Sequence, residues 1–304
     1  MILYQMNKNV RLEVKLTMPK IVQFIHPGVE HGPDKDQTCK KWNTDKHKRK
    51  FLLADGEYVE GEKLKQGQLM FWGEWEPPSK VEKLETNGNS LYPQWLHRPY
   101  LPNPLPTNPK LQNTDPFVFG ESFKYFRCQQ FRKNKPTQLA SLDHGSLVLF
   151  GSHKDTFFQL DTVFVVSKCY GYSSSDRNAL IDLLNNKGIT EDYYQAVFKM
   201  AFSSETACSK LKTLNLCLYF GATYDNPIKG MYSFSPAKLY NGKKIGFPRI
   251  KQFKYKTYIE PKLPQGFKIT EVGLDEIKDF WEKIREISRE SCCVEGIKFN
   301  YDKE

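Results

Sequence analysis

Short apolar and aromatic runs separated by Pro, Gly and Asn restrict the fold of this chain more than any other feature. From Ile21 to about Ser167 these runs lack helical periodicity, and short apolar runs bounded by turn residues are typical of β-strands. The runs predict strands at 21–25, 68–75, 116–119, 146–150 and 157–166. The first half of the chain is therefore predicted to be rich in β-structure.

Helical spacing begins after residue 173. Small capping residues at 173–176 precede apolar residues at helical spacing, closed by Gly188. A second helix is expected from Thr190 to Ala201, and a third short helical segment is expected after Ser203. These three segments predict a helical insertion between two β-rich sections.

The end of the chain combines a second β section with one helix. Residues 214–220 and 230–259 have β character, whereas Leu274 to Ile287 place apolar residues along one helical stripe. The predicted fold class is therefore α+β. It has a β-rich N-terminal half, as a small barrel or a mixed sheet, then the helical insertion, the second β section and a C-terminal amphipathic helix.

Three regions are expected along the chain. Residues 1–19 are predicted to be an appended or disordered leader, and residues 20–170 a β-rich domain that carries the ligand pocket. Residues 171–304 are predicted to be an α+β region, which packs either separately or as one unit with the first.

The chain is basic, with a formal net charge of +10 and a pI near 9.1. That charge favours phosphates, nucleic acid or another acidic surface as partner. Aromatic residues make up 14% of the chain, which excludes a disordered protein, and no apolar run approaches the roughly 20 residues that cross a bilayer. Seven cysteines lack the paired spacing of a zinc site, so we expect free thiols in a soluble, cytoplasmic protein.

The loop after the first predicted strand has H-x-x-x-E-H spacing. Pro and Gly at 27–28 and 32–33 prevent the helix on which zinc peptidases carry such ligands, so the sequence assigns no metal ligand. A zinc site on the loop itself would need further ligands from elsewhere in the chain. The loop either forms a hydrogen-bonded turn or supplies acid–base groups at a strand end. Under the second interpretation the candidate catalytic residues are His26, Glu30, His31, Asp45 and His47.

Within the first hundred positions, cationic and aromatic residues lie between the candidate acid–base residues. A cationic run at 46–50 lies between Trp42 and Phe51. It is able to bind phosphate while an aromatic ring stacks on a base or sugar, or it forms only a solvated loop or edge strand. A Trp beside two acids suits a cationic or base-like ligand, although the pattern favours core packing of Trp72 with exposed glutamates. The candidate ligand-binding residues are Trp42, Lys48, Arg49, Trp72, Glu74, His97 and Arg98.

A second basic and aromatic segment lies at 243–258. A strand here presents cations and aromatic rings to one groove, or its lysines protect a sheet edge. The candidate nucleic-acid-binding residues are Lys243, Lys244, Arg249, Lys251, Lys254 and Lys256.

Asp161 interrupts the apolar run at 157–166. A carboxylate on a strand is inexpensive where it faces water, but in a core it must be paired or serve a site. We expect Asp161 to face outward.

These features favour a protein that binds nucleic acid or a nucleotide-like ligand. A hydrolase or transferase reaction at a phosphate or glycosidic bond, using His and acid chemistry, is the corresponding activity. The alternative is a non-catalytic interaction or scaffold protein with a basic surface. The sequence leaves substrate, cofactor and oligomeric state undecided.

Overall fold

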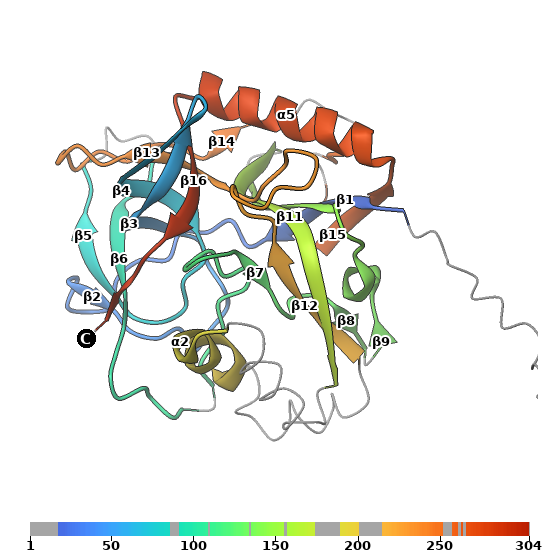
Figure 1. The fold of residues 1–304 in the computed structure, drawn as a ribbon. Coiled ribbons are helices and arrows are strands. Elements are labelled where there is room, and N and C mark those ends of the chain that lie inside the picture. The colour runs from blue at the N-terminus through green and yellow to red at the C-terminus, as the bar shows by residue number, and fades with distance from the viewer. Residues whose placement is uncertain are drawn as a thin grey trace, which may run out of the picture.

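Strands dominate the computed structural model of the protein (Figure 1). It describes residues 18–85, 91–108, 110–133, 135–154, 157–173, 189–200, 215–251, 257–260, 263 and 266–303. The expected leader at 1–19 therefore lies almost entirely outside the described residues. Within the described part of the chain, no helix is long and apolar enough to span a membrane.

The first sheet is mixed and has the order β15-β1-β10-β11-β12-β7, with β14 beside β11. β1 runs parallel to β10, and the other neighbours are antiparallel. Its strands are β1 (Lys20–His26), β7 (Lys124–Tyr125), β10 (Leu147–Lys154), β11 (Phe157–Ser173), β12 (Asn215–Gly221), β14 (Ile250–Lys251) and β15 (Gly266–Glu271).

The second sheet has the order β16-β13-β4-β3-β6-β5-β2, with β17 beside β6. Its strands are β2 (Cys39–Lys40), β3 (Lys50–Glu60), β4 (Lys63–Gly73), β5 (Ser79–Lys83), β6 (Trp95–Leu101), β13 (Ser235–Leu239), β16 (Val294–Phe299) and β17 (Asp302–Lys303). A tight turn at Gly61, with a positive φ of 64°, joins β3 to β4. A separate hairpin pairs β8 (Phe131–Arg132) with β9 (Lys135–Pro136).

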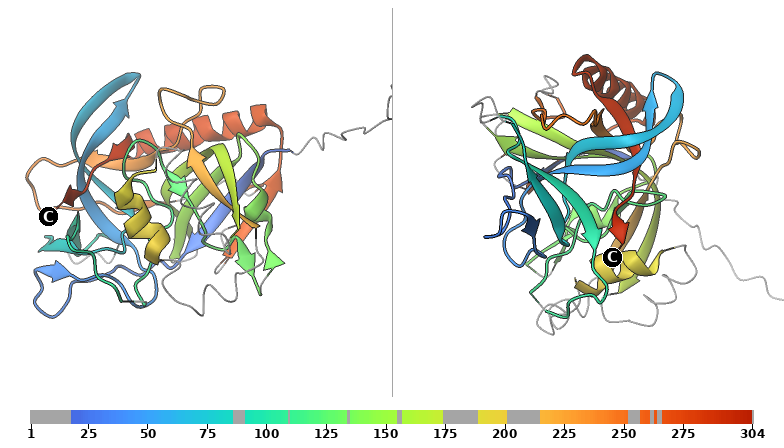
Figure 2. Two further views of the ribbon diagram at one scale, coloured as in Figure 1. Left: turned by 60° about the horizontal axis from the view of Figure 1, so that its bottom comes forward. Right: turned by 90° about the vertical axis from the view of Figure 1, so that its left-hand side faces the viewer.

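Helices are few among the described residues. The longest is α5 (Leu274–Glu290), which confirms the predicted C-terminal amphipathic helix. α2 (Glu191–Tyr193) continues into a wider helical turn, η2 (Tyr194–Lys199), on the opposite side of the molecule from α5 (Figures 1 and 2). A 3-10 turn, η1 (Gln138–Ser141), precedes β10.

The α+β prediction is wrong, because strands in two mixed sheets make up most of the regular structure. Among the described residues the helical insertion comprises α2 and η2, and the first and third predicted helical segments fall at 174–188 and 201–214, outside the described residues. The error has a physical cause: a short strand such as β16, which belongs to no predicted element, becomes buried only by pairing with the distant strands β3 and β13.

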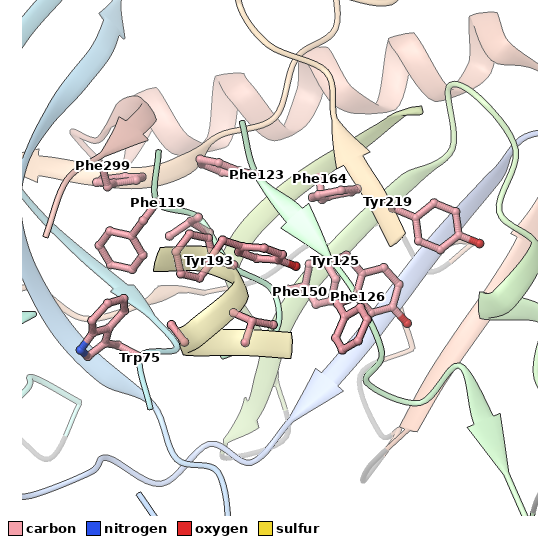
Figure 3. Packing of buried hydrophobic residues seen from close by; sticks show 14 of the residues in the cluster. Trp75, Phe119, Phe123, Tyr125, Phe126, Phe150, Phe164, Tyr193, Tyr219 and Phe299 are labelled. Atoms are coloured by element: carbon pink, nitrogen blue, oxygen red, sulfur yellow. The ribbon is translucent and has the colours of Figure 1, made fainter. Parts of the chain in front are cut away.

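Alternation along the strands divides the core into layers. On β1, Val22 and Phe24 face the second sheet, whereas Ile21 and Ile25 face α5. The layer between the sheets is rich in aromatic rings, which interlock across β-strands and loops (Figure 3). Because β1 is buried on both faces, a polar side chain at its end is fixed inside the molecule.

Candidate functional site

A cluster of charged side chains lies where the two sheets meet. His26 ends β1, His47 and Arg49 precede β3, and Glu74 and Glu76 follow β4. The register of β3 and β4, with Lys50 opposite Gly73, brings the segment before β3 next to the segment after β4. Backbone bonds from the His31 N–H to the Arg49 carbonyl (2.8 Å) and from the Arg49 N–H to the Val29 carbonyl (2.9 Å) attach the loop after β1.

Glu74 is at the centre of this cluster. Its Oε1 lies 3.0 Å from His47 Nδ1, and its Oε2 pairs with Arg49 and lies 3.4 Å from His26 Nδ1. Glu76 Oε1 is also 3.0 Å from His47 Nδ1. The two Glu side chains are only 2% and 1% exposed, so their charges are screened little by water.

The surroundings set the protonation states. Burial alone raises the pKa of a carboxyl group, but His47, Arg49 and His26 together hold the pKa of Glu74 well below its usual range. Burial lowers the pKa of His47, yet Glu74 and Glu76 outweigh it and raise that pKa to about 11. Burial and Arg49 lower the pKa of His26 to about 3. At neutral pH the cluster thus holds an imidazolium at His47 and a neutral His26.

The charges continue beyond Glu74 in alternating sign. Arg49 Nη1 lies 3.6 Å from Asp161 Oδ2, and Asp161 Oδ1 lies 3.5 Å from Arg249 Nε. The Arg249 guanidinium stacks on Trp72 at 4.1 Å and donates to the Gly28 carbonyl at 3.2 Å. Asp161 is 1% exposed, so the prediction that it faces outward is wrong. We call His47, Glu74, Arg49, Asp161 and Arg249 the charge line.

A small cavity of about 170 Å³, the Glu74 cavity, opens beside this cluster. Its lining includes His47, Glu74, Asp115, Arg127 and Cys128. Burial raises the pKa of Asp115 to about 6, although the backbone N–H groups of residues 126–128 donate to its carboxylate and oppose that rise. Burial also raises the pKa of Cys128, whose thiol lies 3.7 Å from His26 Nε2.

A larger hollow of about 540 Å³ is called the lysine hollow. Two of its lining residues, Lys46 and Lys48, flank His47 in the sequence. Its lining includes Lys40, Lys41, Lys46 and Lys48 together with Asp34. Lys40 Nζ pairs with Asp34 Oδ1 at 2.9 Å, and the other three lysines form no ion pair with the described residues. The hollow thus presents three unpaired cations.

A third cavity, of about 500 Å³, lies at the Arg249 end of the charge line. Trp72, Trp95, Tyr92 and Gln159 line it with Arg249. The charge line therefore runs from the Glu74 cavity to a cavity with aromatic walls.

The five candidate catalytic residues are not in one place. His26 and His47 belong to the cluster around Glu74. Glu30 accepts backbone N–H bonds of residues 94 and 95 at 2.9 and 3.0 Å, and Asp45 is exposed in the lysine hollow. His31 is buried beside that hollow, and burial with Lys50, Lys40 and Lys48 lowers its pKa to about 3.

The candidate ligand-binding residues also divide. Arg49 and Glu74 lie in the cluster, Lys48 in the lysine hollow and Trp72 against Arg249. The remaining three have structural contacts with other residues. Trp42 lines the lysine hollow as well, but it is buried and donates to the Gln112 carbonyl at 2.8 Å. His97 lies 2.8 Å from both Ser79 Oγ and the His31 carbonyl, and Arg98 pairs with Glu82 at 3.2 Å.

The second basic segment is only partly described. Lys243 and Lys244 are exposed, and Lys244 lies 3.6 Å from Glu82. Arg249 is buried and paired with Asp161 rather than presented on the surface. Lys251 belongs to β14, whereas Lys254 and Lys256 lie outside the described residues.

Sequence reasoning missed Glu76, Asp115 and Cys128 in this site. Of the two acids that follow β4, the sequence predicted only Glu74 as a site residue; β4 ends at Gly73, and the side chains of both Glu74 and Glu76 are buried. The available signal was two acids in an otherwise aromatic and Pro-rich run, where a solvated strand edge is a poor explanation.

Fold and site together define a protein of two mixed sheets with a buried histidine–carboxylate cluster at their junction. No protein-family model, no curated protein and no solved structure matches the chain. The geometry and chemistry of the site are therefore the only indication of function.

Proposed function

We propose that the protein binds a phosphate-bearing ligand, a nucleotide or nucleic acid, in the lysine hollow. The observation that carries this proposal is the set of three unpaired lysines, Lys41, Lys46 and Lys48, around one cavity. Unpaired cations that share a concave surface raise the local concentration of anions. Its volume of about 540 Å³ is in the range of small-ligand sites.

The neighbouring Glu74 cavity supports a chemical role. The His47 imidazolium can donate a hydrogen bond or a proton to a reacting group, while the ionised Glu74 holds its ring in place at 3.0 Å. The cavity of about 170 Å³ fits a reacting group rather than a whole nucleotide. We infer hydrolysis or transfer at a phosphate or glycosidic bond, with the ligand held by the hollow and its reacting end in the cavity.

A cytoplasmic location is part of the same proposal. The six cysteines in the described ranges are free thiols, and two of them, Cys292 and Cys293, are adjacent in sequence. Free thiols are typical of reducing compartments.

Binding to labelled single-stranded DNA, RNA and a nucleotide panel across a salt series tests the proposal. Lys46→Glu combined with Lys48→Glu reverses two charges in the hollow. We expect weaker binding and a salt dependence smaller by about two in the slope of log affinity against log salt.

The matched control is Lys63→Glu combined with Lys83→Glu, which reverses two exposed lysines outside the hollow. The control should bind as the wild type does. Equal losses in both double variants would show that only net charge attracts the ligand. No binding at low salt would leave the scaffold alternative in place.

A further inference from the structure

Three side chains at the Glu74 cavity have the arrangement of metal ligands, and two of them, His47 and Glu74, line it. His47 Nδ1 lies 3.0 Å from both Glu74 Oε1 and Glu76 Oε1, and the three groups offer ligand atoms within 4.8 Å of one another. An octahedral ion with bonds of about 2.1 Å has neighbouring ligand atoms about 3.0 Å apart. The spacing therefore fits ligands around one ion as well as it fits hydrogen bonds, and a bound ion would displace the proton that His47 Nδ1 otherwise holds between the two carboxylates.

We propose that His47, Glu74 and Glu76 bind one divalent transition-metal ion. This inference rests on the site of the proposed function, but not on its phosphate-bearing ligand. One imidazole with two carboxylates suits Mn²⁺, Fe²⁺ or Zn²⁺ better than Cu⁺, which selects sulfur ligands.

An unsatisfied carboxylate oxygen supports the ion independently of the spacing. Glu76 is fully buried, and its Oε2 has no hydrogen-bond partner among the described residues. A buried carboxylate oxygen without a partner is costly. The buried ammonium nearest to Glu76 in the sequence is that of Lys50, and it donates to the Pro77 carbonyl at 3.4 Å instead of to Glu76 Oε2.

Outer contacts hold the ligands in place. Arg49 pairs with Glu74 Oε2, which leaves Oε1 towards His47. The Asp115 N–H donates to Glu74 Oε1 at 3.3 Å, and the Glu76 N–H donates to Thr114 Oγ1 at 2.9 Å. Such contacts orient metal ligands and tune their affinity.

The cavity supplies room for the remaining coordination positions. His47 and Glu74 line it together with Asp115 and Cys128. Three protein ligands beside an open space are the arrangement of catalytic rather than structural metal sites. Water or a ligand oxygen can occupy the positions that the protein leaves open.

Metal titration of the full-length, EDTA-treated protein tests the inference. Free Mn²⁺, measured by its electron paramagnetic resonance signal, should fall by one equivalent per chain, and Zn²⁺ should compete. Glu76→Gln and His47→Gln should each weaken binding by about 100-fold or more, because even outer-shell changes cost 10–100-fold. Glu295→Gln, a buried glutamate paired with Arg285, is the matched control and should bind as the wild type does.

A second measurement uses only the wild-type protein, so it tests the site even if the substituted proteins fail to fold. In the wild type, Mn²⁺ should broaden the imidazole resonances of His26 and His47 but not those of His144. His144 is the distant reference, because it precedes β10, whereas His26 is in register with Ser152 near the opposite end of that strand. Broadening of all three signals alike, or none, would overturn the site.

Other outcomes separate the two proposals. Wild-type protein that takes up no Mn²⁺ or Zn²⁺, or a folded Glu76→Gln variant that binds as tightly as the wild type, would contradict the metal site. Lys46→Glu combined with Lys48→Glu should keep the metal, since these lysines do not line the Glu74 cavity. Metal uptake without any nucleic-acid or nucleotide binding would leave this inference standing and remove the proposed function.

Discussion

At the scale of single residues, Asp161 shows how much a buried charge depends on its partners. The carboxylate lies on β11 between two arginines, Arg49 and Arg249, that are themselves buried. Removing one member of such a group leaves the others uncompensated in a medium of low dielectric constant. The group is therefore expected to be sensitive to any single substitution.

Asp161→Asn should lower the free energy of unfolding by about 3–5 kcal/mol, measured by urea denaturation. Asp275→Asn is the control: Asp275 pairs with Lys229 on the surface, where water screens the pair, so this substitution should change stability little. Equal effects of the two substitutions would mean that Asp161 does not neutralise the arginines.

The sequence predicts part of the candidate site at this scale. His26, His47 and Glu74 are recognisable because polar groups follow or precede apolar runs. The burial of Glu76 depends on where β4 ends. The contact of Asp115 with Glu74 depends on how a loop distant in sequence folds back onto the site. No local sequence pattern encodes either feature.

At the scale of elements, α5 protects one face of the first sheet. Ile277, Phe280, Trp281 and Ile284 form its buried stripe and pack on apolar residues of β1, β10 and β11. The Trp281 indole also donates to the Tyr232 carbonyl at 3.0 Å. The stripe has the spacing of a helix that stabilises the fold through packing.

Ile284→Ala should destabilise the protein by about 2–5 kcal/mol in thermal or urea unfolding, because Ile284 is fully buried and its loss leaves a cavity. Asp279→Ala on the exposed side of α5 should change stability by less than about 0.5 kcal/mol. A near-neutral Ile284→Ala would show that α5 is not packed on the sheet.

Strong periodicity decided which elements were predictable. β1, β11 and α5 carry long apolar patterns and were confirmed. β16 was missed because its six residues include a glycine and two charged residues. It becomes buried through β3 and β13, which lie far away in sequence.

At the scale of the whole molecule, both sheets combine strands from the two halves of the chain. β12 and β15 from the second half complete the first sheet, and β13 and β16 complete the second. Without them, β3 and β4 lose paired neighbours and expose sheet edges.

Fragments 1–170 and 171–304 should therefore each fail to unfold cooperatively when expressed alone, as measured by circular dichroism during heating. Mixed or co-expressed, the two fragments should recover a cooperative transition. A cooperative transition in either isolated fragment would show that the halves are independent domains.

The charge line has a consequence for how this protein can vary. Each of its five side chains is balanced by its neighbours, so no position can change its charge alone without leaving a buried partner uncompensated. Related sequences that keep the fold should change these positions together: one that loses Asp161 should also lose Arg49 or Arg249. Covariation at these positions would then identify relatives with the same two-sheet junction even where their overall sequence similarity is too low to do so.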